Sequence, residues 1–379
     1  MKNKKILING ISAKSGGGKS ILINFIKILM KNTSKNIYYI LTPNTEFYSI
    51  LIKNNPNIKL IYISDFFKNK YILSFTHRFI LPFLINKYNI NLVFNLSDIP
   101  VVTKKFQIFL FDWSYAVYPE SKVWEMMSSK DYYVRKLKLF FFKKNLKSID
   151  LVVAQTNAMK DRLESIYKIK KVEVIGNAVS LENLKGEDNF NFNLKNKINL
   201  LYLTYYYPHK NLEIFIQLAQ IIKKKKLNFN LIITIDSNQN KEAESFLNNI
   251  KYKKLDDIII NVGPVDMQNV PSLYKQCDGL LMPTLLESFS GTYVEAMFHE
   301  IPIFTSNFDF SKDICRDGAV YFDPFNEYDI IEKLHFIYNN PSEKIKLLSN
   351  AKERLNAFSS WEQTFNKFNK LFENNHHVE

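Results

Sequence analysis

The stretch Met282-Pro-Thr-Leu-Leu-Glu-Ser-Phe-Ser-Gly-Thr-Tyr-Val-Glu-Ala-Met297 joins an apolar strand to a helix through a small polar turn. It places Glu287 in the loop after the strand and Glu295 one turn inside the helix. N–H groups at a helix start favour a diphosphate, and two carboxylates can accept hydrogen bonds from vicinal sugar hydroxyls. The stretch therefore predicts a sugar-nucleotide site. The alternative is an amphipathic helix whose two glutamates are merely solvated.

The same alternation of strand and helix runs through most of the chain. Apolar runs typical of strands occur at 6–9, 37–41, 59–63, 92–96, 107–111 and 151–154, and again at 200–204, 231–235, 258–262, 279–282 and 302–305. Helical spacing separates many of them, as at Leu22, Phe25, Ile26 and Leu29. Strands alternating with amphipathic helices indicate parallel sheets covered on both faces.

The chain is long enough for two domains, because 379 residues exceed the size at which one core keeps growing. Hydrophobic periodicity lapses in the Asn-rich stretch 180–199 and restarts beyond it. We therefore expect an α/β protein with Rossmann-like domains at 1–180 and 195–358, followed by a C-terminal helix and tail at 359–379. Ligands of such sheets bind at the carboxyl ends of the strands, so a cleft between the domains is the expected site.

The composition restricts the partners and the compartment. Lys and Arg outnumber Asp and Glu by 51 to 37, and the resulting net charge of +14 indicates a negatively charged partner. Two distant cysteines, Cys277 and Cys315, predict neither a disulfide framework nor a zinc site, which fits a cytoplasmic protein. No secretory signal or spanning segment is expected, so any membrane contact would be peripheral.

A glycine-rich segment, Ala13-Lys-Ser-Gly-Gly-Gly-Lys-Ser20, follows the first strand and precedes the first helix. Its backbone could cradle a phosphate. With Ala13 in place of the first glycine it also matches the P-loop of nucleoside triphosphatases, where Lys19 and Ser20 would reach phosphate and magnesium. A P-loop ATPase, with Asp98 as its metal ligand, is therefore an alternative function, and a structural glycine turn is a third interpretation.

Tyr205-Tyr-Tyr-Pro-His-Lys-Asn211 lies between a strand and a helix expected to begin near Leu212. Lys210 would then stand at a helix start, where the macrodipole disfavours a cation unless an anion joins it. A ligand diphosphate would supply that anion.

Two helices carry unusual aromatic content. Trp361, Phe365, Phe368 and Phe372 share one helix face, which must be buried on its own domain or on the first one. The segment 131–147 combines Phe140-Phe-Phe142 with six Lys and Arg residues. It is either a peripheral helix for an anionic bilayer or a core helix with solvated lysines.

Several motifs in order resemble the retaining glycosyltransferases of family 4, which have the GT-B fold of two Rossmann-like domains facing each other across a cleft. Besides the 282–297 stretch, the resemblance rests on motifs that follow the family's order: Leu151 to Thr156, Val174 to Val179, Val262 to Val265, Leu273 to Asp278, Ala319 to Pro324 and Phe358 to Trp361. It covers nearly the whole chain, and it implies that the domain at 1–180 binds the acceptor and the domain at 195–358 binds the nucleotide sugar. The 205–211 variant resembles members that build surface polysaccharides.

The resemblance implies a role for each matching residue. Glu287 would contact donor sugar hydroxyls, Lys210 would neutralise the departing phosphates, and Glu295 would bind the ribose. Donor contacts are further implied for His209, Asn211, Gly263, Val265, Ser290, Gly291 and Thr292, and for Gly16, Gly17 and Gly18 of the first domain. Asp112 stands where the family often has an acceptor-side histidine, and Tyr205 stands where it often has an arginine.

The expected function is transfer of a hexose from a nucleotide sugar to a lipid-linked or growing saccharide in bacterial-type surface polysaccharide synthesis, such as O-antigen or capsule. No Asp-x-Asp pair is placed for manganese, so neither a metal nor another cofactor is expected. The enzyme would act in the cytoplasm, with peripheral contact to the inner face of the membrane through 131–147. A nucleic-acid-binding protein is a third class, which would need basic and stacking aromatic residues on one surface.

Overall fold

The structure is a computed structural model. It describes residues 3–14, 16–31, 36–52, 55–69, 71–179, 181–186, 190–194 and 197–374. The chain forms two compact units. Unit 1 comprises Met1–Pro119, Met127–Ala178 and Ser359–Glu379, and unit 2 comprises Glu120–Met126 and Val179–Phe358. The expected domain at 1–180 therefore lacks a short piece, residues 120–126, which belongs to unit 2, and the described part of the C-terminal segment, 359–374, belongs to unit 1.

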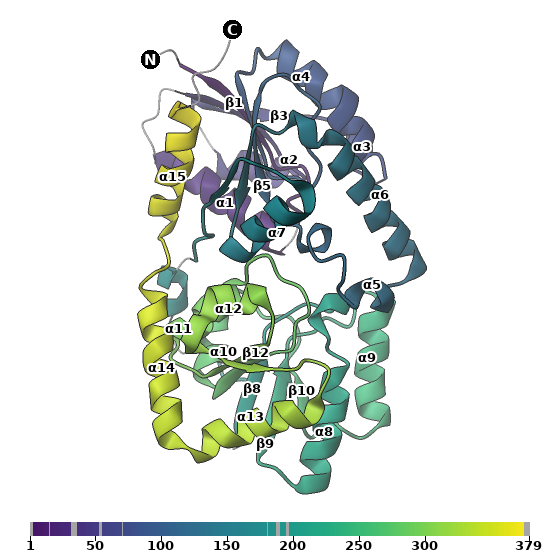
Figure 1. Ribbon diagram of the computed structural model, residues 1–379, viewed down its shortest axis with the longest axis vertical. Coiled ribbons are helices and arrows are strands. Elements are labelled where there is room, and N and C mark those ends of the chain that lie inside the picture. The colour runs from purple at the N-terminus through teal and green to yellow at the C-terminus, as the bar shows by residue number, and fades with distance from the viewer. Residues whose placement is uncertain are drawn as a thin grey trace. The chain divides into compact units, whose positions relative to one another are not determined.

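Unit 1 is built around a parallel sheet, shown in Figure 1. Its strands are β1 (Lys5–Asn9), β2 (Ile37–Leu41), β3 (Ile58–Ile61), β4 (Leu92–Asn95), β5 (Phe106–Phe111), β6 (Leu151–Ala154) and β7 (Val172–Val174), in the order β3-β2-β1-β4-β5-β6-β7. Its α-helices are α1 (Gly16–Lys31), α2 (Thr45–Leu51), α3 (Leu73–Phe75), α4 (Leu81–Lys87), α6 (Ser129–Asn145), α7 (Asn157–Tyr167) and α15 (Trp361–Asn374), with a π-helical turn at Thr76–Ile80 between α3 and α4.

Both faces of this sheet are covered. Successive residues of a strand point to opposite faces. Ile6 and Ile8 accordingly join the hydrophobic cluster that includes α1 and α15, whereas Leu7 joins a second cluster with Leu73 and Leu81 of α3 and α4. The prediction of a parallel sheet buried on both sides is confirmed for this unit.

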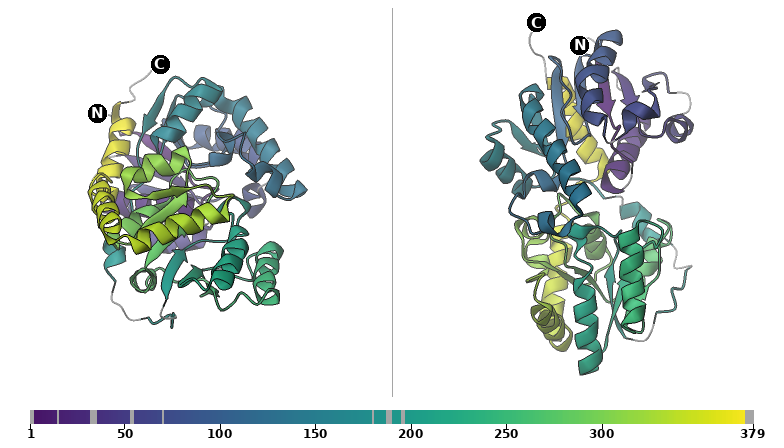
Figure 2. Two further views of the ribbon diagram at one scale, coloured as in Figure 1. Left: turned by 60° about the horizontal axis from the view of Figure 1, so that its bottom comes forward. Right: turned by 90° about the vertical axis from the view of Figure 1, so that its right-hand side faces the viewer.

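The C-terminal helix α15 packs on α1 within unit 1, as Figures 1 and 2 show. Phe365, Phe368 and Phe372 surround the ring of Phe25, with centroids 5.1, 5.8 and 6.2 Å away. All three phenylalanines are at most 4% exposed. Of the two expected burial sites for this aromatic face, the structure therefore selects the first unit.

Unit 2 repeats the architecture. Its strands are β8 (Ile198–Tyr202), β9 (Phe229–Ile233), β10 (Ile259–Asn261), β11 (Gly279–Met282), β12 (Ile303–Ser306) and β13 (Val320–Phe322), in the order β10-β9-β8-β11-β12-β13. Its α-helices are α5 (Val123–Met126), α8 (Ile214–Lys225), α9 (Lys241–Tyr252), α10 (Val270–Lys275), α11 (Gly291–Phe298), α12 (Asp309–Cys315), α13 (Glu327–Asn339) and α14 (Pro341–Leu355). All strand pairs of both sheets are parallel, so the predicted α/β class is confirmed.

In each sheet one place favours a ligand. Strand order reverses direction between β1 and β4 in unit 1, and between β8 and β11 in unit 2. The loops that leave two such strands diverge, which opens a crevice beyond the carboxyl ends.

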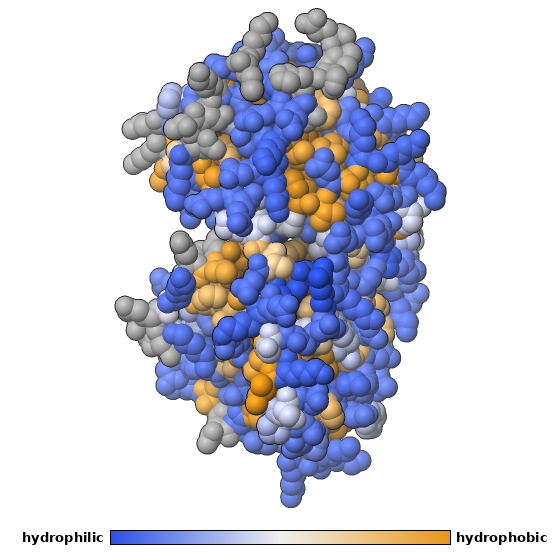
Figure 3. All heavy atoms as spheres, turned by 60° about the vertical axis from the view of Figure 1, so that its left-hand side comes forward, coloured by the Kyte–Doolittle hydropathy of each residue, from blue (hydrophilic) through white to orange (hydrophobic). Residues whose placement is uncertain are grey.

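On the face in Figure 3, hydrophilic residues cover most of the surface and hydrophobic residues form separate patches. No helix in the part of the chain that the structure describes is long and apolar enough to cross a membrane.

Candidate active site

The loop after β8 holds Lys210 in a fixed position. Lys210 ends a short 3-10 helix, Pro208–Lys210, and its carbonyl oxygen accepts a hydrogen bond of 3.0 Å from the Tyr202 hydroxyl. Asn211 follows with a left-handed φ of 53°, and its side-chain amide donates to the Pro324 carbonyl at 2.7 Å. Asparagine tolerates this backbone region better than most residues. The loop is therefore anchored on both sides of the lysine.

The expectation that Lys210 stands at the start of a helix is wrong. Helix α8 begins at Ile214, four residues later. A cation outside the first helical turn has little conflict with the macrodipole, because that effect fades within a turn. The environment of Lys210 comes instead from the neighbouring loop.

That neighbouring loop follows β11 and carries Glu287. The backbone N–H of Leu285 donates to the His209 carbonyl at 2.7 Å, which ties the two loops together. Thr284 lies in the same turn, with its hydroxyl 3.2 Å from both the His209 carbonyl and Glu287 Oε1. Both loops leave strands at the reversal point of the sheet, where a ligand crevice is expected.

Lys210 and Glu287 form an ion pair across this point, between Nζ and Oε1. Their side chains are only 15% and 11% exposed. Such a pair is electrostatically strong but costly to break, because removal of one partner leaves an unpaired charge away from water. Burial raises the pKa of Tyr202, and the nearby charge of Glu287 adds to the shift. The Tyr202 hydroxyl therefore stays protonated and able to hold the Lys210 backbone.

Helix α11 begins beside Glu287 in sequence and has an open N-terminus. Ser290 is its N-cap residue, yet its side chain makes no capping hydrogen bond to the helix backbone and lies 3.2 Å from the Thr292 hydroxyl. The first turn carries no acidic residue. Uncapped N–H groups together with the helix dipole favour a bound anion. Ser290, Gly291 and Thr292 form this helix start, and their contact with a phosphate stays a prediction.

Glu295 lies one turn further along α11. The Tyr274 hydroxyl donates to its Oε2 at 2.9 Å, and the Tyr274 ring stacks on His299 at 4.8 Å between centroids. A β-carbon built at Gly291 would lie 3.7 Å from the other oxygen, Oε1. Burial raises the pKa of Glu295, and the Tyr274 hydrogen bond opposes that shift. Tyr274 therefore orients the carboxylate and leaves Oε1 toward the start of the helix.

Other predicted donor residues are more dispersed. Gly263 follows β10 with φ of 73°, a conformation that favours glycine, and Val265 packs on the core of unit 2. Strand β10 is two strands from β8, and no hydrogen bond or ion pair among the described residues joins this loop to Lys210, Glu287 or Glu295. The ring of His209 stacks on Tyr207 at 5.5 Å.

The glycine-rich segment of unit 1 differs from its prediction. Gly16, Gly17 and Gly18 form the first turn of α1 instead of a loop, so they do not curl around a phosphate as a P-loop does. Their N–H groups still open a helix whose first turn has no acidic residue. Asp98, the metal ligand that the ATPase alternative needs, forms an ion pair with Lys138 of α6.

Asp112 follows β5 and has an altered acidity. Burial and then the negative charge of Asp98 raise the pKa of its carboxyl group from 3.8 to about 7, against an opposing effect of Lys138. A β-carbon built at Gly18 would lie 3.9 Å from its Oδ2. A carboxyl group with this pKa can accept a proton near neutral pH, which is what general base catalysis requires.

The structure adds three supporting residues without a predicted role. Tyr202 holds Lys210, Thr284 contacts Glu287, and Tyr274 orients Glu295. Tyr274 lies in a motif of the family resemblance, but neither its spacing nor that of Tyr202 indicates which carboxylate or carbonyl it would reach. Within the described residues, no three His, Cys, Asp or Glu side chains gather as metal ligands would.

Residues 185–354 match the family model described as Glycosyl transferases group 1. This segment lies within unit 2 and contains Lys210, Glu287 and Glu295 together with the start of α11. The matches give no support to the P-loop ATPase alternative.

Two curated proteins match part of the chain. It is 22% identical over 245 residues to an uncharacterized 41.2 kDa protein in the cps region of Klebsiella pneumoniae, covering 62% of this chain and 63% of that protein. It is 25% identical over 196 residues to the O-antigen chain mannosyltransferase RfbU of Salmonella typhimurium, covering 50% and 51%. The matched region thus spans less than two thirds of either relative.

Solved structures share the fold. A glycosyltransferase from Rickettsia africae aligns with a TM-score of 0.73 at 17% identity, covering 98% of both chains. Anabaena Alr3699/HepE, solved in complex with UDP and glucose, aligns with a TM-score of 0.70 at 12% identity, covering 98% of this chain and 100% of that one. The predicted GT-B fold class is confirmed.

Proposed function

We propose that this protein is a retaining, metal-independent glycosyltransferase that moves a hexose from a nucleotide sugar to a lipid-linked or growing saccharide in surface polysaccharide synthesis. The observation that carries the proposal is the Lys210–Glu287 ion pair at the reversal point of the unit 2 sheet, next to the open start of α11. The match of residues 185–354 to a glycosyltransferase family supports it.

The chemistry assigns a part to each group. The bond from the anomeric carbon to the diphosphate oxygen breaks as a bond to an acceptor hydroxyl oxygen forms, so positive charge develops on the sugar and negative charge on the diphosphate. Lys210 and the N–H groups of Gly291 and Thr292 would stabilise the departing diphosphate. Glu287 would meet the hydroxyls of the donor sugar, close to the positive charge that develops at its anomeric carbon.

The acceptor hydroxyl must lose a proton during this transfer. We propose that Asp112 takes it, since a carboxyl group with a pKa of about 7 is half ionised at neutral pH. Glu295 would accept hydrogen bonds from the ribose hydroxyls through its Oε1, which lies toward Gly291. A donor contact by Gly16, Gly17 and Gly18 stays a prediction, as do those of His209, Asn211, Gly263 and Val265.

A ligand screen tests the donor part. Purified protein would be heated with nucleotide sugars that carry uracil, guanine, thymine or adenine, and with ATP and magnesium. We expect one nucleotide sugar to raise the melting temperature of the wild type, and to do so less for Glu295→Ala. No shift with any nucleotide sugar, together with magnesium-dependent ATP hydrolysis lost in Lys19→Ala, would overturn the proposal in favour of the ATPase.

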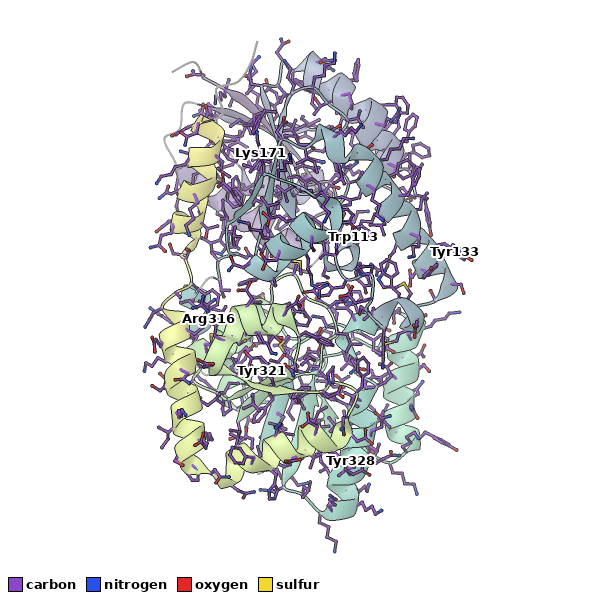
Figure 4. All side chains as sticks on the ribbon, viewed as in Figure 1. Trp113, Tyr133, Lys171, Arg316, Tyr321 and Tyr328 are labelled. Carbon is purple, nitrogen blue, oxygen red and sulfur yellow. The ribbon has the colours of Figure 1, made fainter. Side chains whose placement is uncertain are left out.

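We further propose that the enzyme acts in the cytoplasm and contacts the anionic inner face of the membrane through 131–147. The structure gives α6 two different faces. Phe142 is buried against Phe109 and Phe111, whereas Tyr133, Leu137 and Phe140 form an exposed stripe at 70%, 53% and 55%. Tyr133 points away from the helix into solvent, as Figure 4 shows.

Vesicle sedimentation tests this contact. Tyr133→Ser, Leu137→Ser and Phe140→Ser in one variant should abolish binding to vesicles of phosphatidylcholine and phosphatidylglycerol, because insertion of the stripe requires apolar side chains. A matched variant of unit 2 would change Tyr252, Met267 and Ile345, which are 86%, 67% and 69% exposed. Equal vesicle binding by the wild type and the α6 variant would contradict the proposal.

A further inference from the structure

The loop that follows β5 begins with Asp112 and is held in place by cations. Three aromatic rings within residues 113–118 each lie against the charged group of a residue from α6 or α7. The distances from charged group to ring centroid are 4.3 Å for Lys138 on Trp113, 4.0 Å for Arg135 on Tyr115 and 3.7 Å for Arg162 on Tyr118. Such contacts are attractive because the face of an aromatic ring is electron-rich. The loop is therefore fixed along most of its length.

Lys138 also contacts a second loop. Its ammonium group forms an ion pair with Asp98, in the loop that follows β4, and the two side chains are 22% and 24% exposed. Strands β4 and β5 are parallel neighbours in the sheet, so both loops leave the sheet at the same edge. Asp98 and Lys138 line a pocket of about 1270 Å³ in unit 1. One lysine of α6 thus joins the Asp98 loop to the Asp112 loop.

The position of Lys138 follows from the packing of α6. Arg135, Lys138 and Phe142 are spaced i, i+3, i+7, which places them on one side of an α-helix. Phe142 is buried against Phe109 and Phe111 of β5, so this side of α6 faces the sheet. The backbone of Lys138 is therefore held next to β5 and next to the loop that β5 leads into.

The ion pair between Asp98 and Lys138 acts on the carboxyl group of Asp112. Burial raises the pKa of Asp112, the charge of Asp98 raises it further, and the charge of Lys138 lowers it. From α1 the near residue is Gly18, which has no side chain to add a charge, and a β-carbon built there would lie 3.9 Å from Asp112 Oδ2. Among the described residues, the charged groups that act on Asp112 are therefore the two partners of this ion pair.

We infer that Lys138 is a positioning residue for the proposed reaction: it holds the Asp112 loop through Trp113 and balances the charge of Asp98 beside the carboxyl group that takes the proton. The inference rests on the proposed role of Asp112 as the base. An unbalanced Asp98 would repel the ionised form of Asp112, and only the ionised form can accept a proton. Lys138 acts through Asp112 and does not touch the substrate.

Direct titration of the Asp112 carboxyl group tests the inference without a transfer assay. Protein with 13C-labelled aspartate side chains is titrated by NMR, and Asp112→Asn identifies the signal. We expect Lys138→Met to raise the titration midpoint by roughly one pH unit and Asp98→Asn to lower it, because they remove charges of opposite sign. Lys138→Arg should restore the wild-type midpoint. The matched control is Lys144→Met, which removes the same charge from an exposed position of α6.

The opposite directions separate this role from a merely structural one. If Lys138 only packed the loop, its loss would let water reach Asp112 and would lower the midpoint, because burial has the largest effect on this carboxyl group. An unchanged or lowered midpoint in Lys138→Met therefore overturns the inference. If that variant does not fold, a midpoint in Asp98→Asn that is not lowered overturns it as well.

Transfer kinetics distinguish this inference from the proposed function. At pH 7, kcat of Lys138→Met should fall roughly fivefold, which is the loss of ionised carboxylate for a shift of one pH unit, and KM for the nucleotide sugar should stay unchanged. The loss should disappear at higher pH and in Lys138→Arg. Shifted midpoints with a pH profile that does not follow them would overturn the base role of Asp112 in the proposed function, and not the effect of Lys138 on its carboxyl group.

Discussion

The reversal points of the two sheets have the same backbone topology, but the side chains that meet there are charged in unit 2 and neutral in unit 1. In unit 2 the loops after β8 and β11 bring Lys210 and Glu287 into a nearly buried ion pair. In unit 1 the loops after β1 and β4 meet through the neutral hydroxyls of Ser12 and Ser97, and no carboxylate of the described residues forms an ion pair with Lys14 or Lys19 nearby. The sheet therefore decides where a ligand site forms, while the loop side chains decide which ligand it suits.

The two reversal points also differ in how their cations are neutralised in the absence of a ligand. Unit 2 keeps its ammonium group neutralised until a ligand arrives, and it adds the uncapped start of α11. Among the described residues of unit 1, the pocket cations Lys14, Lys19 and Arg135 form no ion pair, and the Tyr48 hydroxyl and the Arg135 Nε are buried without a hydrogen-bond partner. We therefore expect variants at the unit 2 ion pair to change stability and turnover together.

The largest expected effect is at the ion pair. Lys210→Ala should lower kcat/KM about 10²- to 10³-fold, the range typical of losing one group that stabilises transition-state charge. It should also lower the free energy of unfolding of unit 2, because the Glu287 carboxylate is left nearly buried without its partner. For a fully buried pair this loss is about 3–5 kcal/mol. Transfer kinetics and urea unfolding measure the two effects.

Two comparison variants sharpen this result. Lys210→Met with Glu287→Leu should recover stability but not turnover, since no buried charge remains and no cation faces the diphosphate. Ser12→Ala in unit 1 removes only a neutral hydrogen bond, worth about 1 kcal/mol. Wild-type transfer by Lys210→Ala would refute its role, and an equal loss of stability in Ser12→Ala would break the comparison.

A smaller effect is expected at Glu295. Glu295→Gln should weaken nucleotide binding roughly 10- to 100-fold, because hydrogen bonds to a charged group contribute about 1.5–3 kcal/mol. Tyr274→Phe should weaken binding less, since it leaves the carboxylate and removes only the hydrogen bond that orients it. Isothermal titration with the best nucleotide of the screen measures both. An unchanged dissociation constant in Glu295→Gln would remove the ribose role.

The smallest effect is a change in pH dependence at Asp112. Transfer by the wild type should rise with pH through about 7, as Asp112 loses its proton and becomes able to act as a base. Asp112→Asn should be slower and lack this rise. A wild-type profile that stays flat through this range would argue against Asp112 as the base.

The stability of the protein should also depend on the ionisation of Asp112, but it should fall as pH rises. The folded-state pKa is raised, so the stabilising contribution of the neutral carboxyl is present below about 4 and is lost as pH rises through about 7. The melting temperature of Asp112→Asn minus that of the wild type should therefore increase over this range. A constant difference would show that the group titrates normally.

Much of the fold was predictable because its signals are local. Three strands, β2, β6 and β11, begin and end at the predicted residues, and the other eight predicted strands are shifted by one or two residues. The short strands β7 and β13 were missed as strands, since three residues give little periodicity. The aromatic face of α15 was also predicted, but its contact with Phe25 was not. An apolar helix face indicates that its residues are buried, and it does not indicate which residues they pack against.

By itself, the sequence determined the alternating strands and helices, the two-domain α/β class and the position of Glu287 and Glu295 around the start of one helix. Only the tertiary structure decided that Lys210 pairs with Glu287, that Tyr274 holds Glu295, and that the three glycines lie inside α1. The reason is physical: strand and helix periodicity repeats within a few residues. Contacts between residues 77 apart depend instead on which strands become neighbours in the sheet.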